Sequence, residues 1–135
     1  GQLQQVLLNL VNNAIDAVIE KHGTQGGLIE IEGKIQADGM IGVSVRDNGI
    51  GIEEENKKKV FTPFFTTKSA GKGTGLGLSV CYGIIESMGG MMKFSSKTGE
   101  GSVFTVLLPR KAFDGEEDRS NKGEEHAEYK IAGGG

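Results

Sequence analysis

Residues 41–52 read IGVSVRDNGIGI, and this stretch decides the fold to which the rest of the chain must conform. Ile41, Val43 and Val45 alternate with small or polar residues, which is the pattern of a strand with one buried face. Asp47 continues the alternation, so its carboxylate is expected on the buried face. Because a buried carboxylate needs a hydrogen-bond partner, Asp47 is a candidate binding residue.

The turn after this strand has two interpretations. Asn48-Gly49 is the strongest short signal for a β-hairpin. Residues 53–59, EEENKKK, contain no apolar residue that could form the returning strand, so a hairpin is the weaker alternative. The stronger interpretation is a ligand site, since an ionised carboxylate only accepts hydrogen bonds and would suit the exocyclic amine of adenine.

The segments around this strand show helical and extended patterns in turn. Apolar residues recur at helical spacing over residues 2–21 and from Leu76 to Met88. Strands are predicted at residues 29–35, 41–45, 91–97 and 103–108. A short helix is predicted at residues 53–59. This order predicts an α+β fold, a two-layer sandwich in which helices cover one face of a mixed, mostly antiparallel sheet.

The composition of the chain changes after Pro109. Residues 1–109 carry all of the periodic segments, and their length is typical of a single domain. Residues 110–135 are rich in charged residues and poor in large apolar ones. We therefore expect a domain at residues 1–109 and a disordered polar tail or linker at residues 110–135.

Composition and charge also exclude several classes of protein. Glycine supplies 23 of 135 residues without a Gly-X-Y period, and 36% of the residues are hydrophobic, which excludes collagen and a wholly disordered chain. The net charge of −3 argues against nucleic-acid binding. A single cysteine, no apolar stretch long enough to span a bilayer and no signal peptide favour a cytoplasmic location without membrane contact, although a longer protein could carry an anchor.

The first predicted helix contains three asparagines, Asn9, Asn12 and Asn13, although asparagine is a poor helix former. Asn9 and Asn13 are four residues apart and share one face. Asn13 borders the apolar side of the helix, so it is expected at a cleft beside the core. An amide oxygen is a hard ligand suited to Mg²⁺, while a solvated polar face is the equally weighted alternative.

Residues 71–78 read GKGTGLGL and precede the second predicted helix. Glycines let backbone N–H groups approach phosphates closely, and a helix N-terminus favours negative charge. The run differs from a Walker A loop, because Gly73 follows Lys72, and from the dinucleotide fingerprint, because Leu76 and Leu78 occupy the region of its third glycine. A phosphate site is therefore predicted, with a flexible surface loop as the alternative.

Four motifs, taken in order, resemble the catalytic ATP-binding domain of bacterial sensor histidine kinases, within the superfamily that includes gyrase and MutL. They are NLVNNAIDA at residues 9–17, DNGIGI at 47–52, FTPFF at 61–65 and GTGLGL at 73–78. These motifs resemble the N, G1, F and G2 boxes of that family. By itself FTPFF would also fit a small hydrophobic cluster under a loop. The resemblance covers residues 1–109 and is strongest to the nitrogen-regulation type of sensor kinase.

The resemblance implies ATP and Mg²⁺ as cofactors. It implies that Asn13 coordinates Mg²⁺, that Asn9 lies beside the triphosphate and that Lys68 reaches the phosphates, which makes these three the candidate catalytic residues. Residues 53–75 would form a mobile lid over ATP. The complete set of implied ATP-binding residues is Asn9, Asn13, Ala17, Asp47, Gly49, Gly51, Ile52, Lys68, Gly73, Thr74, Gly75, Leu76, Gly77, Leu78 and Ser102.

The base would be bound at the other end of this set. The resemblance implies that Asp47 accepts a hydrogen bond from the adenine amine and that Ala17 borders the base. Gly49 and Gly51 would let the base approach the backbone. Ser102 stands where the superfamily often has a threonine near a water bound to adenine.

The implied reaction is transfer of the γ-phosphate to a histidine on a separate dimerisation domain, from which it would pass to the receiver domain of a response regulator. His22 and His126 lie outside any motif typical of that histidine and are expected on the surface. Asn9 stands where gyrase-like ATPases have a glutamate, so hydrolysis is expected to be slow. The alternatives are a degenerate nucleotide- or partner-binding module without phosphotransfer and a gyrase- or MutL-like ATP-driven clamp.

Overall fold

The computed structural model describes residues 1–63, 65 and 77–111, and these contain the helices and strands expected from the sequence. In chain order the elements are α1 (Gln2–His22), β1 (Ile29–Ile35), β2 (Ile41–Asp47), the 3-10 helix η1 (Glu54–Lys59), α2 (Gly77–Ser87), β3 (Met91–Lys97) and β4 (Gly101–Leu108). The last strand begins at Gly101 rather than at the predicted residue 103, because Gly101 and Ser102 still pair with β3.

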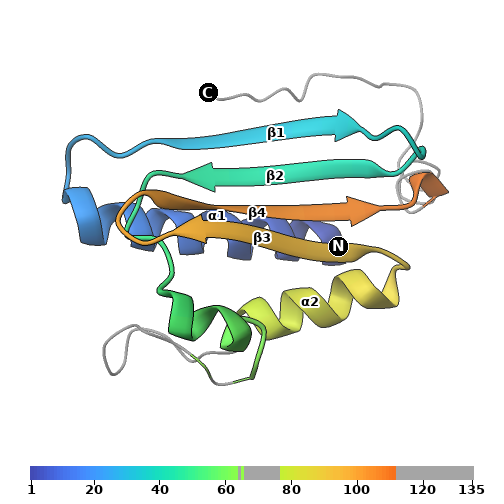
Figure 1. Cartoon of the computed structure of the whole chain (residues 1–135). Helices are drawn as coiled ribbons and strands as arrows, with labels where there is room; N and C mark the ends of the chain where they lie inside the picture. The colour runs from blue at the N-terminus through green and yellow to red at the C-terminus, as the bar shows by residue number, and fades with distance from the viewer. Residues whose placement is uncertain (64, 66–76, 112–135) are drawn as a thin grey trace.

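The four strands form one sheet in the order β1-β2-β4-β3, and each pairing among them is antiparallel (Figure 1). Strand β4 lies between β2 and β3, so the ends of these three strands meet. Asp47 of β2 pairs with Ser102 of β4, and Ser102 pairs with Ser96 of β3. The register therefore places three polar residues in one row at the end of the sheet.

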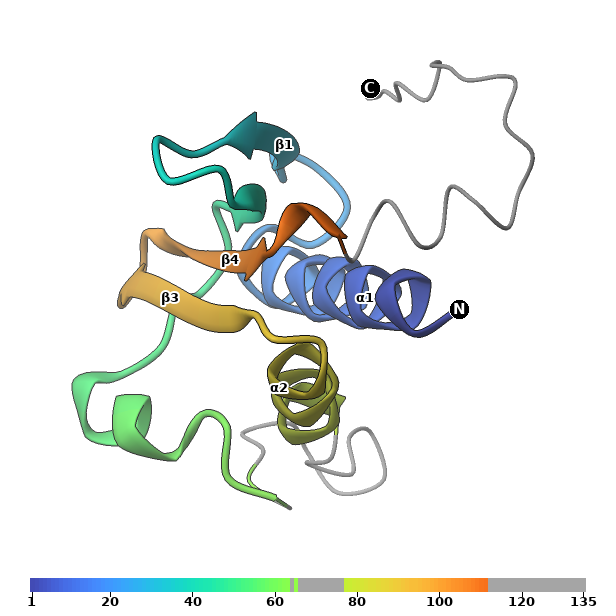
Figure 2. The same ribbon diagram turned by 90° about the vertical axis from the view of Figure 1, so that its right-hand side faces the viewer.

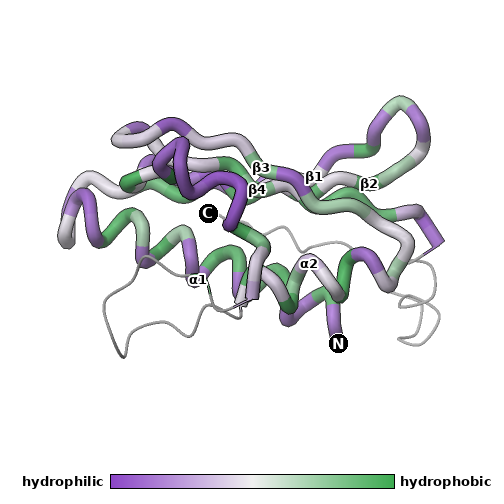
Figure 3. The backbone as a smooth tube through the Cα atoms, turned by 60° about the horizontal axis from the view of Figure 1, so that its bottom comes forward, coloured by the Kyte–Doolittle hydropathy of each residue, from purple (hydrophilic) through white to green (hydrophobic). Residues whose placement is uncertain are grey.

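Helices α1 and α2 lie side by side on the same face of the sheet (Figures 2 and 3). Val6, Leu10, Ala14 and Val18 of α1 are buried and recur every four residues, so they form the apolar stripe that faces the strands. The predicted two-layer α+β sandwich with one helix-covered face is confirmed.

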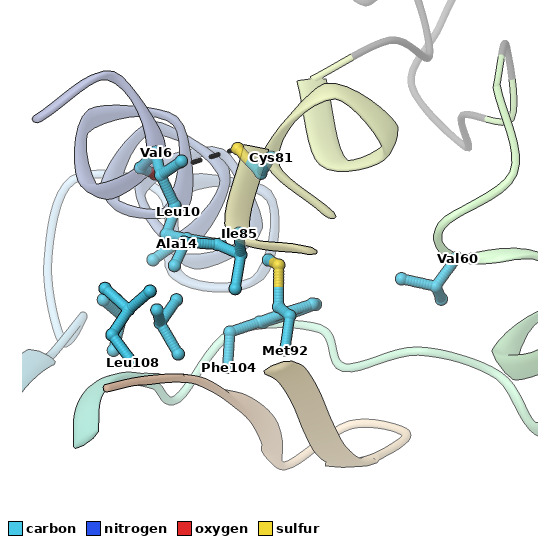
Figure 4. Close-up of a cluster of buried hydrophobic side chains, with 11 residues drawn as sticks. Val6, Leu10, Ala14, Val60, Cys81, Ile85, Met92, Phe104 and Leu108 are labelled. Atoms are coloured by element: carbon cyan, nitrogen blue, oxygen red, sulfur yellow. Dashed lines mark hydrogen bonds between the residues drawn. The ribbon is translucent and has the colours of Figure 1, made fainter. Parts of the chain in front are cut away.

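The core lies between these two layers (Figure 4). Val6 and Leu10 of α1, Ile85 of α2 and Leu108 of β4 are almost completely buried. Phe61, from the predicted FTPFF motif, packs against this core, with its ring centroid 4.8 Å from that of Tyr82, 5.6 Å from that of Phe94 and 6.4 Å from that of Phe104. The motif thus supplies a core contact, as the hydrophobic-cluster alternative expected.

The prediction of a half-buried first strand is wrong at two positions. Ile31 is 61% exposed and Ile35 is 69% exposed. Strand β1 forms an edge of the sheet, and α1 lies mainly over β2. The alternation identified the strand correctly but could not show how much of it the helices cover.

Some expectations fall on residues outside the described part of the chain. These include most of the glycine run and the tail from residue 112 onward. The domain boundary at residue 109 therefore stays a prediction. Among the described residues, neither helix combines the length and hydrophobicity required to cross a bilayer.

Candidate functional site

A cleft of about 840 Å³ opens between α1, the ends of β2 and β4, η1 and the start of α2. Nine residues that the sequence predicted as a binding site line this cleft. They are Asn9, Asn13, Ala17, Asp47, Gly51, Ile52, Gly77, Leu78 and Ser102. Motifs that are far apart in the sequence are therefore brought together around one cavity.

Asp47 lies at the end of β2 and is only 7% exposed, as the alternation predicted. The backbone N–H of Gly49 donates a hydrogen bond to its Oδ1 at 2.8 Å. Burial raises the pKa of the Asp47 carboxyl above its usual 3.8, while hydrogen bonds from the backbone N–H groups of Gly49 and Ser102 lower it in part. The carboxyl group is thus held in place by the backbone and lines the cleft.

The turn after Asp47 is not a hairpin. The chain continues into η1, and the turn is instead bonded to earlier parts of the molecule. The N–H of Asn48 donates to the carbonyl oxygen of Leu28 at 3.2 Å, and the N–H of Ile50 donates to that of Ala17 at 3.3 Å. The weaker interpretation of Asn48-Gly49 is therefore wrong, because the turn docks on α1 rather than reversing a strand.

Gly49 and Gly51 have a structural reason to be glycine that the sequence did not suggest. A Cβ on Gly49 would lie 2.5 Å from the carbonyl carbon and oxygen of Ala17. Gly51 has a φ of +75°, and a Cβ there would collide with the carbonyl oxygen of Lys97. The protein's own backbone therefore requires both glycines, and Gly49 does not line the cleft. Approach of a base to them remains a prediction.

His22 is not the freely solvated histidine that the sequence suggested. It is half-buried at the end of α1, and its Nε2 lies 2.9 Å from the carbonyl oxygen of Asn48. The Asn48 side chain also accepts from the N–H of Leu28 and donates to the carbonyl oxygen of Gly26. His22 and Asn48 together fasten the turn that carries Asp47. His126 lies outside the described residues.

Ser102 lies next to Asp47 in the sheet, is 6% exposed and takes part in a hydroxyl network. Its Oγ is 2.9 Å from Oγ of Ser96. The same Ser96 oxygen accepts the N–H of Ile52 at 2.7 Å and donates to the carbonyl oxygen of Gly101 at 3.0 Å. The network thus connects the floor of the cleft to β3 and to the chain that leads into η1.

Asn9 and Asn13 are half-buried and line the cleft, as the ligand interpretation expected, whereas Asn12 is exposed at its rim. The Asn9 amide nitrogen donates to Sγ of Cys81 on α2 at 3.4 Å. The Cys81 thiol in turn donates to the carbonyl oxygen of Val6 at 3.8 Å, as Figure 4 shows. Burial raises the pKa of Cys81, partly offset by the Asn9 hydrogen bond, so the thiol keeps its proton. The solvated-face alternative is therefore wrong for Asn9.

Several lining residues were not predicted as part of the site. Glu53, Glu55, Asn56, Val60 and Phe65 belong to η1 or its flanks and line the cleft. The resemblance placed their segment, within residues 53–75, in a lid over ATP but assigned none of these five residues a role in binding. Lys57 fixes η1 by donating to the carbonyl oxygen of Ser96 at 2.7 Å and to Glu54 at 2.8 Å. The amide of Asn56 and the aromatic ring of Phe65 were the features of this segment that could have indicated a binding site.

The predicted phosphate end is described only in part. Lys68, Gly73, Thr74, Gly75 and Leu76 lie outside the described residues, whereas Gly77 and Leu78 form the first turn of α2 and line the cleft. In the described ranges no three or more His, Cys, Asp or Glu side chains cluster as a metal site. A metal in this part of the cleft would therefore have at most two such side chains as ligands and would also need amide oxygens, water or ligand phosphates.

Comparison with known proteins agrees with the geometry. Residues 1–112 match the family described as histidine kinase-, DNA gyrase B-, and HSP90-like ATPase. The two-component sensor PprA of Pseudomonas aeruginosa is 43% identical over 109 residues, which cover 80% of this chain and 12% of PprA. The sensor histidine kinase ZraS of Salmonella typhimurium is 46% identical over 108 residues, covering 80% of this chain and 22% of ZraS.

Solved structures show the same similarity. The catalytic domain of histidine kinase ThkA, in a nucleotide-free form, superposes with a TM-score of 0.66 at 41% identity, covering 80% of this chain and 67% of that one. Full-length ShkA in complex with AMPPNP superposes with a TM-score of 0.67 at 28% identity, covering 80% of this chain and 21% of ShkA. The resemblance to sensor histidine kinases is confirmed, and the nitrogen-regulation type stays a prediction.

Proposed function

Because this chain belongs to the histidine kinase-, DNA gyrase B- and HSP90-like ATPase family, we propose that its cleft binds ATP with Mg²⁺ and delivers the γ-phosphate to a histidine. The observation that carries the proposal is the buried Asp47 carboxylate, which lines one end of a cleft whose other end has two asparagine amides. The AMPPNP complex of ShkA supports a nucleotide as the ligand.

At the base end, Asp47 accepts a hydrogen bond from the adenine amine. An ionised carboxylate has no proton to donate, so it favours a base edge that carries a donor. Ala17, Ile52 and Ser102 line the same part of the cleft and would border the base.

At the phosphate end, the Asn13 amide oxygen would hold Mg²⁺, and Asn9 would lie beside the triphosphate. The donor set fits, because Mg²⁺ accepts one or two protein oxygens when phosphates and water supply the rest. Bound Mg²⁺ would neutralise charge on the phosphates. Residues 73–78 and Lys68 complete this end in the proposal, with the first turn of α2 directing backbone N–H groups toward the phosphates.

The phosphate acceptor is a histidine on a separate dimerisation domain, and a response-regulator receiver domain takes the phosphate next. Such a reaction depends mainly on positioning and charge stabilisation. His22 is engaged with the carbonyl oxygen of Asn48 and serves as a structural residue. The chain spans only 12–22% of the PprA and ZraS relatives, so these partners belong to the proposal, as do the cytoplasmic location and the domain limit at residue 109.

Nucleotide titration of the chain with Mg²⁺ and a non-hydrolysable ATP analogue tests the site. We expect Asp47→Asn to weaken binding by at least about tenfold, because a hydrogen bond to a charged group is lost. Asp38→Asn is the matched control, since Asp38 lies in an exposed turn away from the cleft, where it accepts the N–H of Met40. Unchanged affinity in Asp47→Asn would contradict the adenine assignment.

Two further measurements separate the metal and the reaction from simple binding. Asn13→Ala should abolish the gain in affinity that Mg²⁺ gives, while leaving binding without Mg²⁺ unchanged. Phosphate transfer to a supplied histidine-bearing dimerisation domain distinguishes a kinase from a degenerate module. Asn9 has no useful basicity to activate water, so the proposed kinase should hydrolyse ATP slowly. Steady ATP hydrolysis by the chain alone would therefore favour the ATP-driven clamp instead.

A further inference from the structure

We propose that Ser96 determines which way the hydroxyl proton of Ser102 points, and that it thereby makes the base end of the cleft accept hydrogen bonds only. Ser96 would then be a residue that determines base specificity without touching the base. The proposal deepens the nucleotide-binding function proposed above and rests on it.

The direction of the Ser102 proton follows from counting protons on the Ser96 hydroxyl. A hydroxyl group has one proton and two lone pairs. The N–H of Ile52 can only donate, so it uses one lone pair of Ser96, and the carbonyl oxygen of Gly101 can only accept, so it takes the proton. The remaining contact is with Ser102 at 2.9 Å, and there Ser96 can only accept. With all three contacts made as hydrogen bonds, Ser102 donates its proton to Ser96.

The consequence for the cleft concerns the lone pairs of Ser102. With its proton directed to Ser96, the Ser102 oxygen offers only acceptor positions to a ligand. Asp47 pairs with Ser102 in the sheet, and both residues line the cleft. Two neighbouring acceptors favour a base edge with an amine, directly or through a water, and disfavour one with a carbonyl oxygen, because facing acceptors are left unpaired.

Ser96 itself does not line the cleft, so any effect it has on base choice must act through a bonded neighbour that does, either Ser102 or Ile52. The sheet provides a matched control on its opposite face. There the hydroxyl groups of Ser44 and Thr105 are 3.0 Å apart between β2 and β4, and neither residue lines the cleft. Ser44→Ala removes a hydroxyl pair of the same kind without touching the base end.

The test compares the affinities of ATP and inosine triphosphate, which has a carbonyl oxygen where adenine has the amine. Wild type should prefer ATP. In Ser96→Ala the Ser102 proton is free to turn into the cleft and donate to the carbonyl, so the preference should shrink by roughly three- to tenfold. Ser44→Ala should keep the preference of wild type, and Ser96→Thr, which keeps the hydroxyl, should also keep it.

Each outcome decides between specific explanations. If Ser96→Ala weakens both nucleotides equally, Ser96 only supports Ile52 and the proposal is overturned. If wild type binds neither nucleotide, the nucleotide-binding function fails, which is a different result. In a Ser102→Ala background, Ser96→Ala should no longer change the preference. A preference that still shrinks in that background, or a Ser96→Thr variant that loses the preference, would also overturn the proposal.

Discussion

The two ends of the cleft are built in different ways. At the base end, Asp47 and Ser102 sit on strand ends and are held by hydrogen bonds from backbone groups and from Ser96. At the other end, Asn9 and Asn13 project from the middle of α1, and Gly77 begins α2. The base end thus depends on close backbone packing, and the asparagine end depends on which side chains a regular helix carries.

This difference indicates which changes each end can tolerate. Backbone packing leaves no room for added atoms, so a single methyl group should distort the base end. A helix face accepts new side chains with little change in its backbone, so changes there should alter chemistry before they alter folding. Comparing similar substitutions at the two ends therefore tests whether the distinction is real.

The largest effect is expected from Gly49→Ala. Its Cβ would lie 2.5 Å from the carbonyl group of Ala17, so the turn must move away from α1. We expect a loss of roughly 3 kcal/mol in the free energy of unfolding, measured by urea denaturation. Gly83→Ala in α2 is the control, since no atom lies within 4 Å of its Cβ. It should stabilise the protein by about 0.5–1 kcal/mol. Equal effects of the two changes would mean that the contact with Ala17 does not restrict Gly49.

A smaller effect is expected in the pH dependence of stability. Burial raises the pKa of Asp47 above 3.8, so the folded state holds that proton more tightly than the unfolded state. The contribution of Asp47 to stability is therefore complete below pH 3.8 and falls as the pH rises through the raised pKa. Asp47→Asn cannot ionise and lacks this fall. Urea denaturation from pH 3.5 to 7.5 should show the unfolding free energy of the variant rising relative to wild type, and the opposite trend would contradict the assignment.

The smallest effect is expected at the asparagine end, from Cys81→Val. This variant keeps an apolar side chain of similar size but removes the sulfur that accepts the Asn9 amide. We expect affinity for an ATP analogue to fall by at most about threefold, because a weak neutral hydrogen bond is lost. Adenosine binding should not change, since adenosine has no phosphates. Cys81→Ser keeps an acceptor and should restore the ATP affinity. Equal losses for ATP and adenosine would indicate altered packing instead.

Periodic patterns in the sequence correctly predicted the position of those site residues whose orientation follows from their own helix or strand. Helical spacing put Asn9 and Asn13 on one face, and strand alternation put Asp47 on the buried side of β2. The order of helices and strands predicted the layers. Each of these features repeats along the chain with a fixed period, so local reasoning was sufficient.

Features that depend on contact between distant segments were missed or misjudged. The hairpin was correctly the weaker interpretation of Asn48 and Gly49, but nothing local shows that this turn docks on Ala17. His22 looked solvated because its partner lies 26 residues away. The role of Asn56 in lining the cleft depends on where η1 packs. Contacts of this kind leave no periodic pattern in a single sequence, so they could not be predicted from it.

Helix α1 also sets a length. Asn9 and Ala17 line the same cleft, eight residues apart on one continuous helix, so about 12 Å of helix axis separates them. The turn that follows Asp47 is hydrogen-bonded to α1 at Ala17, so the base end of the cleft is fixed to the same helix as the asparagine end. A ligand that reaches both ends must span this interval. Inserting one residue between Asn13 and Ala17 would rotate Ala17 by about 100° around the helix axis relative to Asn13. The two ends of the cleft would then no longer face the same ligand.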